Sequence, residues 1–354
     1  IYDRYGMLLL RQGGTIESES QAQTLLDRGC LIADQEANET QAAEEFLGPI
    51  VPFAAITQLQ SDIGLLHRQI LSGTATNADE TTARMAETIT DAIHRDADAA
   101  LSSMQLQLDP SDHAARQTHA AVICIFAARA LRLDDATVHD LACAALTYDI
   151  ALGPISAQLN AQSTELTLEQ RQLIRMHPER GRRLLEDAGI TNPVWLDAVL
   201  HHHERLDGSG YPDGLRGDAI LRPTRLLAIV DIYTAMLRPR SYRDALPART
   251  ALRNIFLERG KQVDEAFAAA LIKAIGIYPP GTLVRLENGE IGIVLHQGTD
   301  AATPLVARLM TPEGYLTSMV ETRDTRAPGF QITDSVPQDR YPGLTSFNIA
   351  SLWM

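Results

Sequence analysis

The sequence predicts a mainly helical protein with a small N-terminal α+β segment and a small C-terminal β-domain. Residues 111 to about 276 read as a run of helical patterns joined by short loops. After Tyr278-Pro279-Pro280 the apolar period changes from that of a helix to that of a strand. The 354 residues are about twice the usual size of one domain, so two or three domains are expected.

Two segments precede the main helical run. Residues 1–45 read as a strand, a Gly-Gly turn, a second strand and a helix, which is too little chain for a confident core of its own. Residues 46–108 have a helical pattern in which apolar residues recur at threes and fours, at Ile56, Leu59, Ile63, Leu66 and Ile70. We expect this second segment to be a regulatory or dimerisation region, which makes a homodimer possible.

Residues 278–330 read as the small β-domain. VRLENGEIGIVL is a hairpin pattern with Asn288-Gly289 at its turn, a favoured pair for tight connections. PLVARLMTPEGYLT predicts a further strand pair around Pro312-Glu313-Gly314. Residues 331–354 are expected to be an irregular tail.

The composition limits the function classes. The formal net charge of -14 argues against a broad nucleic-acid surface, so an anionic substrate needs local help from metal ions or arginines. The only lysines are Lys261 and Lys273, which leaves Arg as the main cation. Apolar stretches are too short to span a bilayer and no secretion signal opens the chain, so we expect a cytoplasmic protein.

Two histidines lie on the inward faces of predicted helices. His119 is followed by apolar residues at three, four, seven and eight positions, and His177 shares a face with Ile174 and Leu184. Taken alone, either could be a hydrogen-bonded core histidine or a metal ligand.

The segment HHHERLDGSGYPDGLRG, from His201 to Gly217, is a stronger signal. His202 and His203 follow Ala198 and Val199 by four residues, so both imidazoles are expected to face the core. Burying imidazole without a partner is costly and a metal ion satisfies it. We therefore interpret this segment as part of a metal site.

Two carboxylates complete the candidate site. Asp149 and Asp231 lie in apolar helical runs, where a buried acid needs a cation partner, although either could be protonated or paired with a basic side chain. Together the inward donors suit two divalent ions bridged by a carboxylate, and the mixture of imidazole and carboxylate favours Fe, Mn, Ni or Zn. These donors are His119, Asp149, His177, His202, His203 and Asp231.

The segment HHERLDGSGYP, from His202 to Pro212, matches the HHExxDGxGYP signature of HD-GYP domains. The register with His119, His177-Pro178 and Asp231 extends over much of residues 109–277. The resemblance implies an all-helical HD-domain bundle that hydrolyses cyclic di-GMP to pGpG or GMP with two metal ions, Fe or Mn foremost. It further implies that the six donors are the metal ligands and that Asp149 is catalytic.

The resemblance also implies a substrate and partner surface. Arg240 and Arg243 match residues that hold substrate phosphates, and Tyr211 matches the loop beside the site. Arginine suits a phosphate because its planar fork donates paired hydrogen bonds. The alternative is that Arg240 and Arg243 are two solvated surface charges. The Gly210-Tyr211-Pro212 loop matches a segment that contacts partner proteins.

Residues 148–152 read YDIAL where the family pattern has HDIGK, and two functional side chains of the pattern are replaced. Tyr148 stands in place of its histidine and Leu152 in place of its lysine, while Ala115 lacks the glutamate that supports a third metal. One metal position is therefore expected to be weak. The sequence leaves open a phosphodiesterase of reduced activity, an inactive relative that acts as a cyclic di-GMP receptor or scaffold, and a phosphohydrolase for another nucleotide.

Overall fold

The structure is a computed structural model that describes residues 51–106, 112–239, 241, 244–337, 340–341, 344 and 349–353. The chain divides into two units, Ile1–Val51 and Pro52–Met354, and all the helices and strands below belong to the second unit. The predicted segment 1–45 lies outside the described residues.

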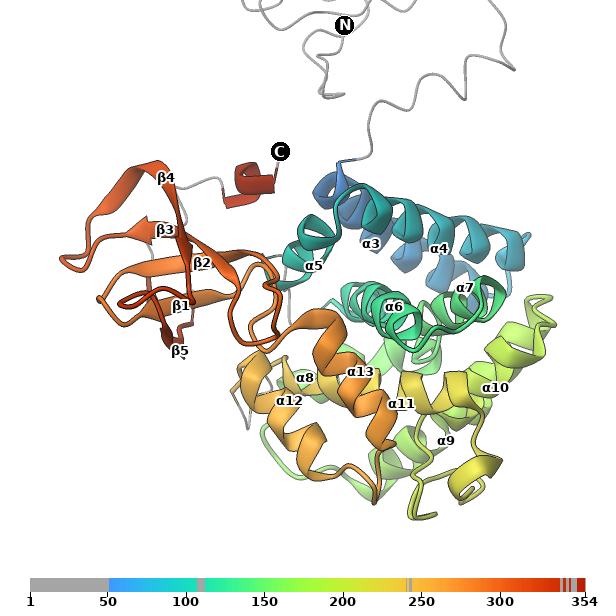
Figure 1. The fold of residues 1–354 in the computed structure, drawn as a ribbon. Helices are drawn as coiled ribbons and strands as arrows, with labels where there is room; N and C mark the ends of the chain where they lie inside the picture. The colour runs from blue at the N-terminus through green and yellow to red at the C-terminus, as the bar shows by residue number, and fades with distance from the viewer. Residues whose placement is uncertain are drawn as a thin grey trace, which may run out of the picture. The chain divides into compact units, whose positions relative to one another are not determined.

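The mainly helical fold class is confirmed (Figure 1). The α-helices are α3 (Pro52–Leu71), α4 (Ala78–Arg95), α5 (Ala97–Leu106), α6 (His113–Ala130), α7 (Asp135–Ala145), α8 (Gly153–Ala161), α9 (Leu168–Asp187), α10 (Pro193–His201), α11 (Arg222–Met236), α12 (Ala248–Leu257) and α13 (Glu265–Ile275). Short 3-10 helices are η1 (Ile150–Leu152), η2 (Gly217–Ala219) and η5 (Ile349–Trp353).

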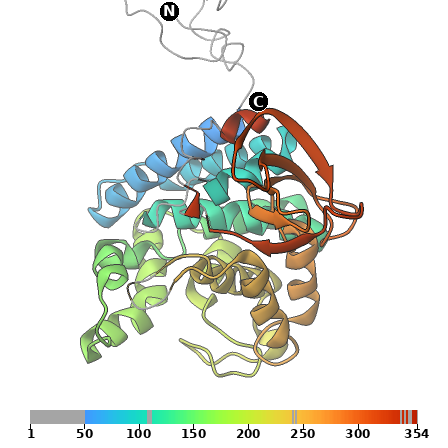
Figure 2. The ribbon, with the colours of Figure 1, turned by 90° about the vertical axis from the view of Figure 1, so that its left-hand side faces the viewer.

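Helix α6 runs through the middle of the bundle, with α3 and α4 on one side and α11 and α13 on the other (Figures 1 and 2). Its side chains are buried around nearly the whole circumference, which is typical of a helix enclosed by other helices. The apolar face predicted from Ile56 to Ile70 is the buried face of α3, and it joins the same core as α6 and α7. The core therefore fixes α6, which carries part of the candidate site.

Helices α9 and α10 begin at well-defined caps. Thr167 accepts a hydrogen bond from the backbone N–H of Gln170, whose side chain in turn accepts from the backbone N–H of Thr167. Asn192 caps α10 by accepting from the N–H of Trp195. Helix α9 continues through Pro178, so the helix places His177 at mid-length rather than at an end.

The C-terminal sheet is antiparallel with strand order β4-β3-β2-β1-β5. The strands are β1 (Leu283–Leu286), β2 (Ile291–His296), β3 (Leu305–Met310), β4 (Leu316–Asp324) and β5 (Ile332–Ser335). The predicted hairpin is present, and Gly289 has a φ of 88° at its turn, a conformation that favours glycine.

The tail is more regular than expected. Strand β5 and helix η5 lie within residues 331–354, and β5 pairs with β1. The sequence ITDS is mostly polar and does not alternate between apolar and polar residues, so its pattern does not predict a strand. Its burial in the structure does not alternate clearly either. The sheet lies beside α5, and His296 Nδ1 lies 2.9 Å from Asp98 Oδ2 there.

Among the described residues, no helix combines the length and the apolar character that crossing a membrane requires.

Candidate metal centre

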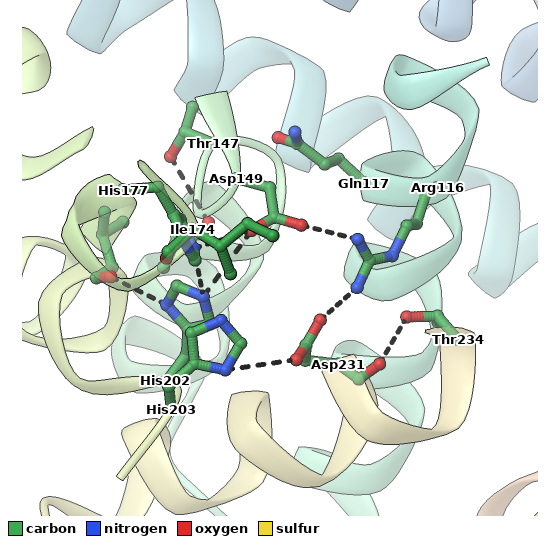
Figure 3. Close-up of polar contacts among 12 residues, drawn as sticks. Arg116, Gln117, Thr147, Asp149, Ile174, His177, His202, His203, Asp231 and Thr234 are labelled. Carbon is green, nitrogen blue, oxygen red and sulfur yellow. Dashed lines mark hydrogen bonds and ion pairs between the residues drawn. The ribbon is translucent and has the colours of Figure 1, made fainter. Parts of the chain in front are cut away.

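Asp149, His177, His202 and His203 converge from three separate parts of the bundle (Figure 3). Asp149 precedes η1, His177 lies within α9, and the two adjacent histidines follow α10. One potential ligand atom from each residue lies within 4.8 Å of all the others. Four of the six predicted donors therefore form one group.

The rings of His177 and His202 are held by backbone carbonyls. Nδ1 of His177 lies 2.5 Å from the carbonyl oxygen of Ile174, and Nδ1 of His202 lies 2.8 Å from that of Val199. A carbonyl can only accept, so each Nδ1 must carry the proton. In its neutral form each ring would then present the lone pair of Nε2 to the centre of the group, which is the form that ligates metals.

These lone pairs meet at close range. The two Nε2 atoms lie 3.1 Å apart, and Asp149 Oδ1 lies 3.0 Å from Nε2 of His177 and 3.6 Å from Nε2 of His202. Three acceptor atoms this close repel one another unless a positive charge lies among them. The donor set, two or three imidazoles and one carboxylate, suits a divalent transition metal.

His203 adds a further neutral imidazole. Burial and the neighbouring histidines hold its pKa well below the ordinary value, so the ring is uncharged near neutral pH. The ring stacks on Tyr211 with centroids 4.7 Å apart, and Nδ1 lies 3.7 Å from Asp231 Oδ2. His203 is therefore the member of the metal group that lies next to Asp231.

Arg116 of α6 was not predicted, and it connects the two carboxylates. Its Nη1 donates to Asp149 Oδ2 at 2.6 Å, and its Nη2 donates to Asp231 Oδ1 (Figure 3). Burial favours the neutral carboxyl of Asp149, but the Arg116 guanidinium outweighs it and the pKa of Asp149 lies well below its usual range. Asp149 therefore stays ionised, and the two side chains share one cation.

His119 is not brought to this group, contrary to the expectation. It lies one turn after Arg116 on α6 and lines a small cavity with Thr234 and Arg238, level with the turn of α11 that follows Asp231. Its side chain is buried, and its Nε2 has no hydrogen-bond partner among the described residues. Burial, with Arg238 nearby, lowers the pKa of His119 to about 3, so it is a neutral core histidine.

The two departures from the family pattern lie at the site. Tyr148 is fully buried, and its ring meets that of His202 edge-on at 5.0 Å. Burial raises the pKa of Tyr148 well above its usual value, so the phenol stays protonated and is a poor ligand. Leu152 lines the cavity beside the site, where it supplies an apolar surface in place of a cation.

A cavity of about 220 Å³ opens onto the metal group. Its walls combine three of the four site residues with cations, polar groups and apolar side chains: His113, Arg116, Asp149, Leu152, Ser156, Leu159, Asn160, Ile174, His177, His203, Tyr211, Asp231, Ala235 and Arg238. Tyr211, a predicted substrate contact, lines the cavity, while Arg240 and Arg243 lie outside the described residues.

The signature loop is fastened to the base of the site by Glu204. Its buried carboxylate accepts hydrogen bonds from the backbone N–H groups of Asp213, Gly214 and Leu215 at 2.7–3.0 Å. A Cβ on Gly210 would lie 2.5 Å from the carbonyl oxygen of His203, so only glycine allows this close approach. The loop thus fixes Tyr211 against His203.

Comparison with known proteins agrees with this arrangement. The family model "HD domain" matches residues 69–267, which is more than half of the chain. A cyclic di-GMP phosphodiesterase of Pseudomonas aeruginosa, PA4108, is 38% identical over 192 residues, which cover 53% of this chain and 46% of the relative. The response regulator RpfG of Xanthomonas campestris pv. campestris, also named a cyclic di-GMP phosphodiesterase, is 33% identical over 161 residues, 45% of this chain and 41% of the relative.

A 3'3'-cGAMP-specific phosphodiesterase of Vibrio cholerae is 31% identical over 159 residues, 45% of this chain and 34% of the relative. The chain spans less than half the length of these three relatives. Among solved structures, Bd1817, an HDG"Y"P protein of Bdellovibrio bacteriovorus, has the same fold, with a TM-score of 0.52 and 16% identity over 73% of this chain and 81% of that one. The predicted resemblance is thus confirmed at the level of the family: the chain belongs to the HD domain family.

Proposed function

We propose that this chain is a metal-dependent phosphodiesterase that hydrolyses cyclic di-GMP to pGpG or GMP, with reduced activity. The observation that carries the proposal is the convergence of the His177 and His202 Nε2 lone pairs on Asp149 Oδ1. The names of the relatives, which are phosphodiesterases for cyclic di-GMP and 3'3'-cGAMP, support this substrate class.

Asp149, His177, His202 and His203 would hold the metal, which we expect to be Fe or Mn. When bound, a divalent ion supplies Lewis-acid chemistry, lowering the pKa of water and neutralising charge on a phosphodiester. The carbonyl oxygens of Ile174 and Val199 orient the two imidazoles by accepting from their Nδ1–H groups. Asp149 is the shared carboxylate, and its low pKa keeps it ionised for this role.

The cavity beside the metal group suits an anionic ligand. Arg116 and Arg238 line its wall, although the whole chain carries a net charge of -14. Tyr211 provides an aromatic surface, and its ring is held by His203 and by Arg175, whose guanidinium lies 5.3 Å from the ring centroid. The cavity therefore offers an aromatic surface to a guanine base and guanidinium groups to a phosphate. Arg240 and Arg243 remain predicted phosphate contacts.

A second function is favoured by one specific feature. Leu152 gives the cavity an apolar side chain where the family pattern has lysine, and the buried Tyr148 gives no nitrogen ligand. A protein with this site could bind cyclic di-GMP without turning it over, as a receptor or scaffold. Partner binding through Gly210-Tyr211-Pro212 and dimerisation through α3 to α5 stay predictions.

The test is incubation of the purified chain with cyclic di-GMP and Mn²⁺ or Fe²⁺, with products separated by chromatography. The proposal predicts pGpG or GMP from the wild type and no product from His202→Gln, which removes a ligand nitrogen. Binding of cyclic di-GMP by calorimetry with no product over many hours would instead establish the receptor function. Neither binding nor hydrolysis would contradict both functions.

A further inference from the structure

We propose that the Arg116 guanidinium takes the place of a second metal ion, so that the site binds one divalent ion beside a cation supplied by the chain. This inference rests on the proposed function, because it concerns the same metal group. It replaces the expectation of two ions.

The two oxygens of Asp149 face different positive groups. Oδ1 points to Nε2 of His177 at 3.0 Å, while Oδ2 accepts from Arg116 Nη1 at 2.6 Å. Asp149 therefore bridges the metal group and a guanidinium, as a shared carboxylate bridges two ions in a two-metal site. The position of a second ion, between Asp149 Oδ2 and Asp231, is where the guanidinium lies (Figure 3).

The remaining donors for a second ion are already engaged. Asp231 Oδ1 accepts from Arg116 Nη2, and Asp231 Oδ2 lies near Nδ1 of His203. The other predicted donor, His119, lies one turn further along α6. A second ion would have to displace Arg116. It would then have the two carboxylates as ligands but no nitrogen ligand from α6.

Charge favours keeping Arg116 in place. The side chains of Asp149 and Asp231 are only 2% and 6% exposed, and that of Arg116 is 16% exposed. Breaking a buried ion pair by removing one partner is strongly destabilising, because a buried charge is left uncompensated. The guanidinium is permanently charged, and two of its nitrogens donate to the two different carboxylates.

The guanidinium differs from a metal ion in what it can do. It carries one positive charge instead of two and donates hydrogen bonds only, so it stabilises a phosphate but cannot lower the pKa of a water molecule by ligation. Arg116 also lines the cavity, within reach of an anionic ligand. This substitution keeps ligand binding while weakening hydrolysis.

The test is Mn²⁺ stoichiometry, measured by calorimetric titration of the chelator-treated 354-residue chain and by elemental analysis. We expect one Mn²⁺ per chain in the wild type and two in Arg116→His, in which an imidazole replaces the guanidinium between the carboxylates. The matched control is Arg175→His, which adds a histidine at the exposed position over Tyr211. It should remain at one Mn²⁺ per chain.

The outcomes separate this inference from the proposed function. Two Mn²⁺ per wild-type chain, both lost in Asp149→Asn, would overturn the role of Arg116 and leave the metal-dependent function standing. No Mn²⁺ in the wild type would overturn the proposed function itself. If Arg116→His does not fold, Arg116→Lys, which keeps the cation, should still bind one ion, and two ions in that variant would contradict the inference.

Discussion

The Nε2 atoms of His177 and His202 lie 3.1 Å apart, and each ring turns its Nδ1 to a backbone carbonyl. The bundle thus holds two lone pairs face to face beside a carboxylate. Either a metal ion or an added proton must separate them. A bound metal contributes to the free energy of unfolding, because the unfolded chain has no preformed site.

Replacing His202 tests this arrangement, and replacing the neighbouring His201 provides the control. We expect His202→Gln to lower Mn²⁺ affinity by more than about 100-fold, which exceeds the 10–100-fold typical of losing a group that only orients a ligand. The control is His201→Gln, because His201 pairs with Asp197 and Asp213 and does not face the metal group. Calorimetric titration measures both, and equal affinities in the two variants would contradict the assignment of His202.

Restoring a cation in the cavity should raise turnover. In Leu152→Lys an ammonium replaces an apolar wall beside the metal group, and one well-placed electrostatic stabiliser is worth on the order of 10² in turnover. Leu159→Lys, on the same cavity wall, should have a smaller effect if position matters. Product formation from cyclic di-GMP by chromatography gives the rates. Combining Leu152→Lys with Tyr148→His, which adds a nitrogen donor, should raise the rate further.

Acid should destabilise the fold through its buried neutral histidines. The pKa of His119 is lowered by burial to about 3, against about 6.5 in the unfolded chain. The unfolded state therefore binds more protons below pH 6.5, and stability falls as pH drops from 6.5 toward 3. For one such group the loss between pH 7.5 and 5.0 is about 2 kcal/mol.

His119→Leu should remove this share of the pH dependence. Urea unfolding at pH 7.5 and 5.0, with chelator present, compares the variant with the wild type. His67, whose pKa burial also lowers to about 3, stays in place and keeps its own contribution in both proteins. If the free energy of unfolding still differed between the two pH values by the same amount in the variant and the wild type, His119 would not be a neutral core residue. Metal binding by the variant should be unaffected.

The loop attached by Glu204 is a further target. Glu204→Ala leaves the N–H groups of Asp213, Gly214 and Leu215 without their acceptor, so we expect the affinity for cyclic di-GMP to fall about tenfold as Tyr211 loses its position. Glu290→Ala removes another buried glutamate, which pairs with Arg323 in the sheet, and should not change ligand affinity. Equal losses in both variants would point to general destabilisation.

Much of the site could be predicted because its ionisable side chains lie in segments that are otherwise apolar. His202 and His203 follow an apolar helical turn, and Asp149 and Asp231 lie in runs that are otherwise apolar, so each needs a buried partner. The same reasoning applied to Arg116, which lies in a buried alanine-rich helix, would have predicted an acidic partner for it. The signal of Arg116 in the sequence is weak because arginine is usually a surface residue.

His119 stays a predicted ligand, but the structure does not bring it to the group of four for a geometric reason. Helix α6 is buried on nearly all sides, so its periodicity does not select one inward face. Residues 116 and 119 are separated by about 60° around the helix and one turn along it, and only the packing of α6 against α11 decides which side chain meets Asp231. The strand β5 was missed because a short polar edge strand has no alternating pattern.

Anomalous scattering from crystals grown with Mn²⁺ would locate the metal site itself. We expect one strong peak among the Nε2 atoms of His177 and His202 and Oδ1 of Asp149, with Arg116 still between the two carboxylates. A map with no peak there at saturating Mn²⁺, and with the two rings still at hydrogen-bonding distance, would show that a proton fills the centre and would contradict the metal site.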